Sequence, residues 1–246
     1  MDLLFPQLEF KSPWMNAAGS LGFAPDPHGP SREEFGAFIT NPISFHPRRA
    51  TSGTRMVRFP GGVLLHTGHP NPGLSKTIKE YARAWERSDQ PIVVHMLGND
   101  GVELRKSVLR LEELENIMAV EIGFPPEIQE GELINTIRAA RGEIPLIVQL
   151  PLHRAVELGE VVTQAGAAAV SLGPPRGTLA DKNGQLVNGR LFGPALFPQG
   201  MMAVQGLVAV KVPVIGGGGV ENKTQGELML AAGALAVQFD IGLWKL

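Results

Sequence analysis

VPVIGGGGVENKTQGELMLAAGALAVQF, residues 212–239, decides the fold of this chain. A Val/Ile-rich run that ends in glycines and continues into a helical pattern indicates a buried parallel strand, a tight turn and a helix. Asn222 or Thr224 can cap this helix and Gly233 can end it, after which Leu235–Phe239 is typical of a further buried strand. The glycine turn could cradle a phosphate, or it could simply let the helix and the strand pack closely.

Working outward, the same alternation of apolar strand and amphipathic helix recurs along the chain and predicts a single-domain α/β protein over 1–246, a (β/α)8 TIM barrel. The terminal segment IGLWKL is too short for an eighth helix, so we expect a barrel shortened at the C-terminus with one apolar flank open. The other expected strands are Pro13–Met15, Ala37–Thr40, Pro91–Leu97, Ala119–Ile122, Pro145–Leu150 and Ala168–Leu172.

Several connections carry local signals of their own. Leu8–Phe10 could pair with the first strand as a hairpin, and no helical pattern fills the loop Pro47–Gly62. Ser75 is a candidate cap for a helix that runs to about Arg87. The long excursion Gly173–Pro198 contains Asn183-Gly184, a pair typical of a two-residue hairpin turn, and we expect it to fold over the barrel mouth.

Composition narrows the possible partners and chemistry. The 246 residues carry a formal net charge of -2, with basic and acidic residues well mixed, so no surface suited to nucleic acid is visible. No cysteine is present, which excludes a disulfide framework, an iron–sulfur cluster and a cysteine nucleophile. No apolar run approaches the length needed to cross a bilayer, so we expect a cytoplasmic protein with no membrane partner.

An ordered series of motifs resembles the dihydroorotate dehydrogenase family, FMN-dependent (β/α)8 barrels of pyrimidine synthesis. The resemblance runs nearly end to end, and it is carried by SPWMNAAGSLG, GAFIT, HPRR, GGVLLHTGHPNPG, IPLIVQLP, AGAAAVSL, NGRLFGPAL, VPVIGGGGV and AGALAVQ. It implies an oxidoreductase acting on a CH–CH bond with FMN as cofactor. The residues that it assigns to the cofactor are Ala18, Gly19, Thr40, Gln149, Gly193, Gly218 and Gly219, and Asn71 is assigned to the substrate.

The departures from the family fall mainly on functional positions. Asn41 and Gln149 stand where the family has active-site lysines, and Gly123-Phe124-Pro125-Pro126 replaces the loop that carries an Asn ligand and the Cys or Ser base. Asp240-Ile241 stands where a Gly-Ser/Thr pair meets the phosphate, unless the alignment slips and Gly242 takes that place. Three further family asparagines are replaced by His66, His95 and Gly173.

Three functions follow from these features. The first is a diverged flavoprotein with weak or no activity on dihydroorotate, because a general base contributes about 10²–10⁴-fold to such a reaction. The second is a non-catalytic relative that serves as a structural or regulatory subunit, and the third is a non-flavin barrel enzyme acting on a phosphorylated metabolite. The first is favoured by the resemblance.

The histidines, the loop arginines and the C-terminal tryptophan each have a functional and a structural interpretation. His66, His69, His95 and His153 lie in or near the mouth loops and could bind a metal, but we assign no metal site because loop spacing does not fix ligand geometry. Four arginines, Arg48, Arg49, Arg55 and Arg58, could attract an anion, although solvation of a loop is the preferred interpretation. Trp244 beside Leu243 and Leu246 favours a contact surface, so we expect a homo- or hetero-oligomer through the open flank.

Overall fold

The computed structural model describes residues 8–26, 35–98, 100–125 and 127–240. Its centre is an eight-stranded parallel sheet with the order β1-β12-β11-β8-β7-β6-β5-β2. A parallel bridge between Met15 and Ala37 joins the two end strands and closes the sheet into a barrel, which confirms the predicted fold. The strands are β1 (Trp14–Asn16), β2 (Phe38–Ile39), β5 (Ile92–Leu97), β6 (Ile117–Gly123), β7 (Leu146–Pro151), β8 (Ala169–Gly173), β11 (Val214–Gly216) and β12 (Ala236–Phe239).

The closure between β1 and β2 depends on one side chain. Asn16 is fully buried, and its Oδ1 accepts from the backbone N–H of Ile39 at 2.9 Å. Its Nδ2 donates to the Ile39 carbonyl at 2.7 Å. The side chain of Asn16 therefore makes the two hydrogen bonds with Ile39 that a neighbouring strand would otherwise make, at a point where β1 and β2 are too short to pair fully.

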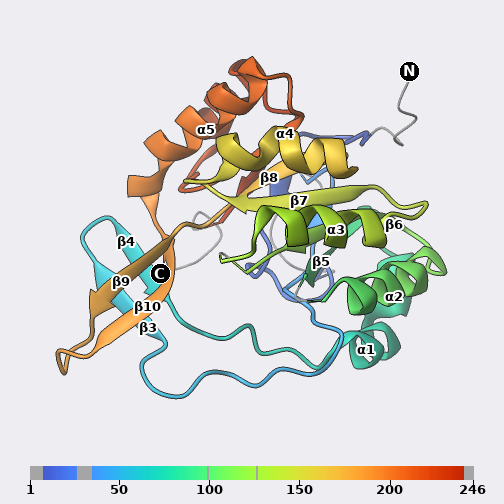
Figure 1. Ribbon diagram of the computed structural model, residues 1–246, viewed down its shortest axis with the longest axis horizontal. Helices are drawn as coiled ribbons and strands as arrows, with labels where there is room; N and C mark the ends of the chain where they lie inside the picture. Colours follow the sequence, from blue (N-terminus) through green and yellow to red (C-terminus); the bar gives the residue numbers. More distant parts are fainter. Residues whose placement is uncertain (1–7, 27–34, 99, 126, 241–246) are drawn as a thin grey trace.

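Helices pack on the outside of the barrel (Figure 1). They are α1 (Leu74–Glu86), α2 (Gly101–Glu112), α3 (Glu130–Ala140), α4 (Ala155–Ala165), α5 (Phe197–Ala209) and α6 (Lys223–Ala231), with a short 3-10 helix η1 (Pro194–Leu196) before α5. Among the described residues, no helix is both long and apolar enough to span a bilayer. Trp244 and the expected open flank lie outside the described residues.

Two apolar clusters hold the barrel together. The larger one lies between the strands and the helices, and the smaller one fills the barrel interior with residues such as Met15, Val93 and Ile147. Leu8 and Phe10 pack against this inner cluster, and residues 8–10 belong to no strand. The predicted hairpin of Leu8–Phe10 is therefore wrong, because these side chains are used to cover the interior instead.

A second, smaller sheet stands beside the barrel at the lower left of Figure 1. It has the order β3-β4-β10-β9 and joins two connections that are far apart in sequence: β3 (Met56–Phe59) and β4 (Gly62–Leu65) with β9 (Arg176–Ala180) and β10 (Leu186–Phe192). The segment 47–62 contains β3. The sequence shows no helical pattern there, and no strand was predicted for it. The long excursion lies at the mouth as expected, since side chains of β9 and β10 line the cavity there.

Of the predicted helix caps and turns, one cap is confirmed, and one cap and one turn differ from the prediction. Asn222 caps α6 by accepting from the N–H of Gln225, as predicted. The helix after Gly73 has no side-chain cap, so the prediction for Ser75 is wrong. The turn between β9 and β10 has three central residues, because the N–H of Asp181 bonds to the carbonyl of Gln185 and Gly184, at φ 77°, provides the left-handed residue. The predicted two-residue turn is therefore too short.

Candidate active site at the mouth of the barrel

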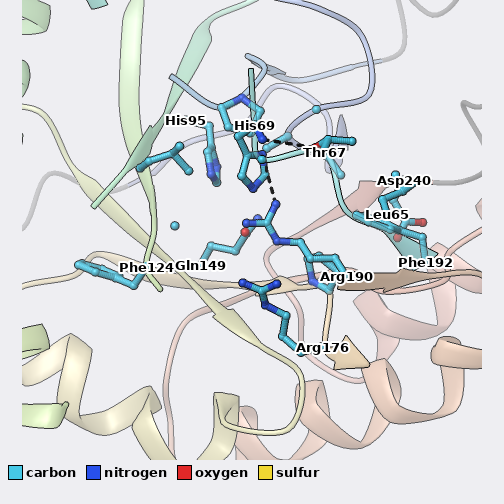
Figure 2. A pocket seen from close by; sticks show the side chains of 18 of the residues that line it. Leu65, Thr67, His69, His95, Phe124, Gln149, Arg176, Arg190, Phe192 and Asp240 are labelled. Atoms are coloured by element: carbon cyan, nitrogen blue, oxygen red, sulfur yellow. Dashed lines mark hydrogen bonds between the residues drawn. The ribbon is translucent and has the colours of Figure 1, made fainter. Parts of the chain in front are cut away.

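A cavity of about 460 Å³ opens where the barrel strands end and the small sheet leans over them (Figure 2). This volume suits a cofactor or a small metabolite. Residues from the ends of β1, β5, β7 and β12 line one side, and residues from β4, β9 and β10 line the other. The cavity therefore lies at the carboxyl end of the strands, which is where barrel enzymes place their chemistry.

Four of the residues predicted from the resemblance to contact a flavin line this cavity together. They are Ala18 and Gly19 after β1, Gln149 on β7 and Gly218 after β11. These residues are far apart in sequence, and the barrel brings them to one wall. Gln149 is partly buried and presents an uncharged amide where the family has a lysine.

Two other predicted site residues support the walls. Thr40 is fully buried, and its Oγ1 accepts from the backbone N–H of His95 at 3.0 Å. Asn71 accepts from the N–H of Gly73 at 2.9 Å and donates to the carbonyl of His69 at 3.0 Å. Thr40 therefore ties β2 to β5, and Asn71 fixes the shape of the loop that carries His69.

The remaining predicted residues, Gly193 and Gly219, lie where backbones approach closely. A Cβ on Gly193 would come within 2.1 Å of the Gly61 carbonyl, and one on Gly219 within 2.5 Å of the Gly193 carbonyl. The N–H of Gly219 donates to Oδ2 of the buried Asp240 at 3.4 Å. A carboxylate thus faces the glycine turn at the position where a phosphate was expected.

A buried polar cluster forms the floor of the cavity. His95 Nδ1 lies 2.5 Å from Glu121 Oε2, and Gln238 Nε2 donates to Glu121 Oε1 at 2.6 Å. Burial acts to raise the pKa of Glu121, but the hydrogen bond and charge of His95 outweigh it, with further help from Ser171 and Gln238, and the pKa is lowered. Glu121 accepts the proton of His95 Nδ1 and leaves Nε2, which lies beside Gly123, as the ring atom on the cavity side.

Two glycines make room for the large polar side chains of the site. A Cβ on Gly123 would lie 2.8 Å from His95 Nε2, and one on Gly173 would lie 2.8 Å from Cγ of Gln149. The four positions at which the resemblance indicates departures from the family therefore lie in two pairs, His95 with Gly123 and Gln149 with Gly173. The sequence showed the four changes without showing that they form two pairs.

The loop expected to hold a catalytic base carries no Cys or Ser in its described part, and its one described carboxylate, Glu127, lines the cavity at an exposed position. Phe124 and Pro125 line the cavity after Gly123, and neither side chain can accept a proton. A buried proton acceptor is present on the floor, where the Glu121 carboxylate orients His95. This pair was missed from the sequence, although Glu121 lies two residues before Gly123 in a strand whose alternate residues point into the barrel.

Arginines surround the opposite wall. Arg176 and Arg190 are directly opposite each other on β9 and β10, and Arg48 lines the same cavity. Burial, together with the charges of Arg176 and Arg48, lowers the pKa of Arg190 to about 10. All four loop arginines are exposed, as expected for a solvated loop, and Arg48 also lines the cavity, whereas Arg49, Arg55 and Arg58 do not.

His69 completes the arginine wall. Its Nδ1 lies 3.2 Å from Arg190 Nη1 (Figure 2), so the guanidinium donates and the ring accepts. Burial first, and then the charges of Arg190, His95, Arg48 and Arg176, lower the pKa of His69 to about 2. The ring is consequently neutral at physiological pH. Within the described residues, no three His, Cys, Asp or Glu side chains are grouped so that they could hold a metal ion.

Comparisons with known proteins agree with this geometry. The family model for dihydroorotate dehydrogenase matches residues 2–140. The catalytic subunit of dihydroorotate dehydrogenase B (NAD(+)) of Pelobacter propionicus is 30% identical over 253 residues, which cover 94% of this chain and 83% of that protein. Dihydroorotate dehydrogenase A (fumarate) of Lacticaseibacillus paracasei is 28% identical, covering 96% of this chain and 90% of that protein.

The fold is also shared with solved structures. A ligand-free dihydroorotate dehydrogenase of Eimeria tenella superposes with a TM-score of 0.75 at 18% identity, covering 96% of this chain and 80% of that chain. A structure of the Eimeria tenella enzyme with ferulenol gives a TM-score of 0.73 at 17% identity, covering 95% and 77%. Together with the sequence matches, this places the chain in the dihydroorotate dehydrogenase family of oxidoreductases.

Proposed function

We propose that this chain is a flavin-dependent oxidoreductase of that family that takes a flavin at the barrel mouth and has little or no activity on dihydroorotate. The observation that supports the flavin is the convergence of Ala18, Gly19, Gln149 and Gly218 on one cavity. These residues come from three separate strand ends, and they are the positions that the family resemblance assigns to the cofactor.

The two ends of an FMN molecule fit this cavity differently. Small residues at Ala18, Gly19 and Gly218 leave room for a flat ring, and the amide of Gln149 can hydrogen-bond to its polar edge. The phosphate end meets a conflict, because Asp240 is buried and already accepts from the N–H of Gly219. Two negative charges about 4 Å apart repel by roughly 1–4 kcal/mol in a partly solvated site. The residues fit the flavin ring and oppose its phosphate at this turn.

The chemistry of the walls argues against dihydroorotate as the main substrate. A bound flavin supplies a hydride acceptor, and dihydroorotate oxidation also requires a base that removes a proton. Phe124 and Pro125 lie in the loop where that base belongs in the family, and the one described carboxylate of this loop, Glu127, is exposed. No described residue that lines the cavity is a lysine, so any negative charge must be met by arginines. His95, held by Glu121, can exchange a proton on the floor of the cavity.

Reconstitution with flavin tests the proposal. The purified protein, incubated with FMN or riboflavin and desalted, should show a flavin absorbance spectrum, and turnover of dihydroorotate should be near the background rate. Leu65→Trp places a large side chain on the cavity face of β4 and should abolish flavin retention. Leu186→Trp, on an exposed position of β10 outside the cavity, is the matched control.

A colourless protein under all of these conditions would refute the flavin proposal. Rapid oxidation of dihydroorotate would refute the claim that its catalytic base has been lost. Retention of flavin by Leu65→Trp to the same extent as by Leu186→Trp would show that the flavin binds elsewhere on the molecule.

A further inference from the structure

We propose that Arg48, Arg176 and Arg190, together with His69, form a subsite that binds the oxyanion group, carboxylate or phosphate, of a small-molecule substrate. This inference rests on the proposed function, because the bound molecule is a substrate only if the chain is an enzyme. It adds the charge class of the molecule that the cavity takes beside the flavin. The group of four residues is called the arginine subsite below.

The register of the small sheet places two like charges face to face. Arg176 and Arg190 are directly opposed partners in the antiparallel pair β9–β10, so their Cβ atoms are about 5 Å apart and their side chains leave the same face. Figure 2 shows both guanidinium groups pointing to the side of the cavity where Gln149 lies. Directly opposed like charges destabilise a sheet. A sheet with this arrangement is stabilised when an anion lies between the two groups.

In the described part of the chain, the carboxylates that line this cavity are Glu127 and Asp240. None of the described carboxylates forms a salt bridge with Arg48, Arg176 or Arg190. Arg190 is partly buried, and its one hydrogen bond to a described side chain goes to a neutral ring, His69. A guanidinium group has five N–H donors, so most of its donors remain for a ligand. A planar pair of these donors matches the geometry of a carboxylate or a phosphate.

The loops that complete the arginine subsite are firmly positioned. The backbones of Arg48 and Asn71 exchange two hydrogen bonds, at 3.0 and 3.1 Å, which fixes Arg48 beside the loop of His69. Asn71 also holds the carbonyl of His69. Because His69 Nδ1 accepts from Arg190, its Nε2 carries the hydrogen and is a further donor in a subsite that otherwise contains cations. The wall therefore combines the partly buried Arg190 and His69 with the exposed Arg48 and Arg176, all of which line the cavity.

The enclosure of the cavity limits the size of the ligand. At about 460 Å³ it accommodates a small molecule, and the net charge of the chain, -2, gives no general attraction for polyanions. The arginine subsite is thus a local positive region in a slightly acidic protein. A carboxylate and a phosphate monoester present the same oxyanion chemistry to it, and direct titration can distinguish them.

Isothermal titration of the purified protein with sodium phosphate and with succinate, at ionic strength held constant with NaCl, tests this inference. We expect at least one of the two anions to bind, with phosphate favoured if the ligand is a phosphate ester and succinate favoured if it is a carboxylate. Arg190→Met and Arg176→Met should each weaken that binding roughly tenfold or more. Arg58→Met, at an exposed position of β3 outside the cavity, should leave it unchanged.

Thermal unfolding distinguishes a variant that has lost anion binding from one that has lost its fold. Arg190→Met removes a partly buried cation that its neighbours repel, so its melting temperature without ligand should equal or exceed that of the wild type, while the rise in melting temperature on adding the anion is lost. Binding of neither anion by the wild type, or equal binding by the wild type and Arg190→Met, would overturn the inference.

Flavin binding is scored separately on the same proteins. Anion binding without flavin retention would leave the arginine subsite standing and remove the flavin proposal. Flavin retention without anion binding would support the flavin proposal and remove the arginine subsite. If Arg190→Met lost FMN and kept riboflavin, the arginines would hold the phosphate of the cofactor, and the assignment to a substrate would be wrong.

Discussion

At the scale of single residues, His69 couples the arginine subsite to pH. Its pKa is about 2 in the folded protein, through burial and the charges of Arg190, His95, Arg48 and Arg176, and about 6.5 in an unfolded chain. Between these values the unfolded chain binds a proton that the folded protein does not, so the free energy of unfolding falls as pH drops below about 6.5. The stability contributed by neutral His69 is complete above that pH and is lost toward pH 2.

Urea unfolding at pH 7, 6 and 5 measures this effect. Between pH 7 and 5 the wild type should lose about 1–2 kcal/mol more of its free energy of unfolding than His69→Asn does. Asparagine is chosen because it tolerates the left-handed backbone of this position, φ 51°. His153→Asn, at an exposed position outside the cavity, should behave as the wild type does. Parallel pH curves for the wild type and His69→Asn would show that His69 is not held neutral.

The facing arginines of the arginine subsite could not be predicted from the sequence. A two-residue turn at Asn183-Gly184 would set Arg176 opposite Leu191, with the two arginines on different faces of the sheet. The observed three-residue turn shifts the register by one residue and sets Arg176 opposite Arg190. A one-residue difference in turn length therefore hid the principal charged pair of the site. By contrast, the position of Ala18, Gly19, Gln149 and Gly218 at the cavity could be predicted, because each lies at or beside a strand end that the apolar pattern indicates clearly.

At the scale of elements, the closure of the barrel depends on Asn16. Its amide joins both backbone groups of Ile39 that face β1, where only one bridge, Met15 to Ala37, otherwise joins the described parts of the two strands. Asn16→Ala leaves a buried N–H and a buried carbonyl without these partners and should lower the free energy of unfolding by about 2–4 kcal/mol. Chemical denaturation followed by circular dichroism measures this loss.

Asn188→Ala is the matched control for this substitution. It removes an exposed asparagine of the small sheet and should change the free energy of unfolding by no more than about 0.5 kcal/mol. If the two variants lost equal stability, the amide of Asn16 would not be what holds β1 to β2.

The strands and helices of the barrel could largely be predicted from the sequence, and those of the small sheet could not. Parallel strands such as β5 and β7 are continuous apolar runs, because both faces are buried and the pattern is strong. β3 alternates between exposed and partly buried residues over four positions, in a segment with many Pro, Arg and Gly residues. Its pairing partner β4 is stabilised by β10, more than 120 residues further along the chain, a contact that local patterns do not reveal.

At the scale of the whole molecule, the chain keeps the barrel of the dihydroorotate dehydrogenase family, and charged groups lie on two sides of its mouth. Positive charge lies on the small sheet, at Arg176 and Arg190, whereas the barrel wall carries Gln149. Negative charge lies at Asp240, beside the glycine turn. This distribution is the basis of our proposal that the cavity takes a flavin ring and an anionic partner, and that it opposes a phosphate at the turn where the family resemblance expects one.

Titration of the wild type and Asp240→Asn with FMN and riboflavin, followed by flavin fluorescence, tests this account most directly. The wild type should bind riboflavin at least as tightly as FMN. Asp240→Asn should bind FMN roughly tenfold or more tightly than the wild type does and leave riboflavin unchanged, because only FMN carries the phosphate that the carboxylate repels. Asp181→Asn, in the turn of the small sheet, is the control and should change neither affinity. A wild type that binds FMN much more tightly than riboflavin, or that binds neither, would contradict the account.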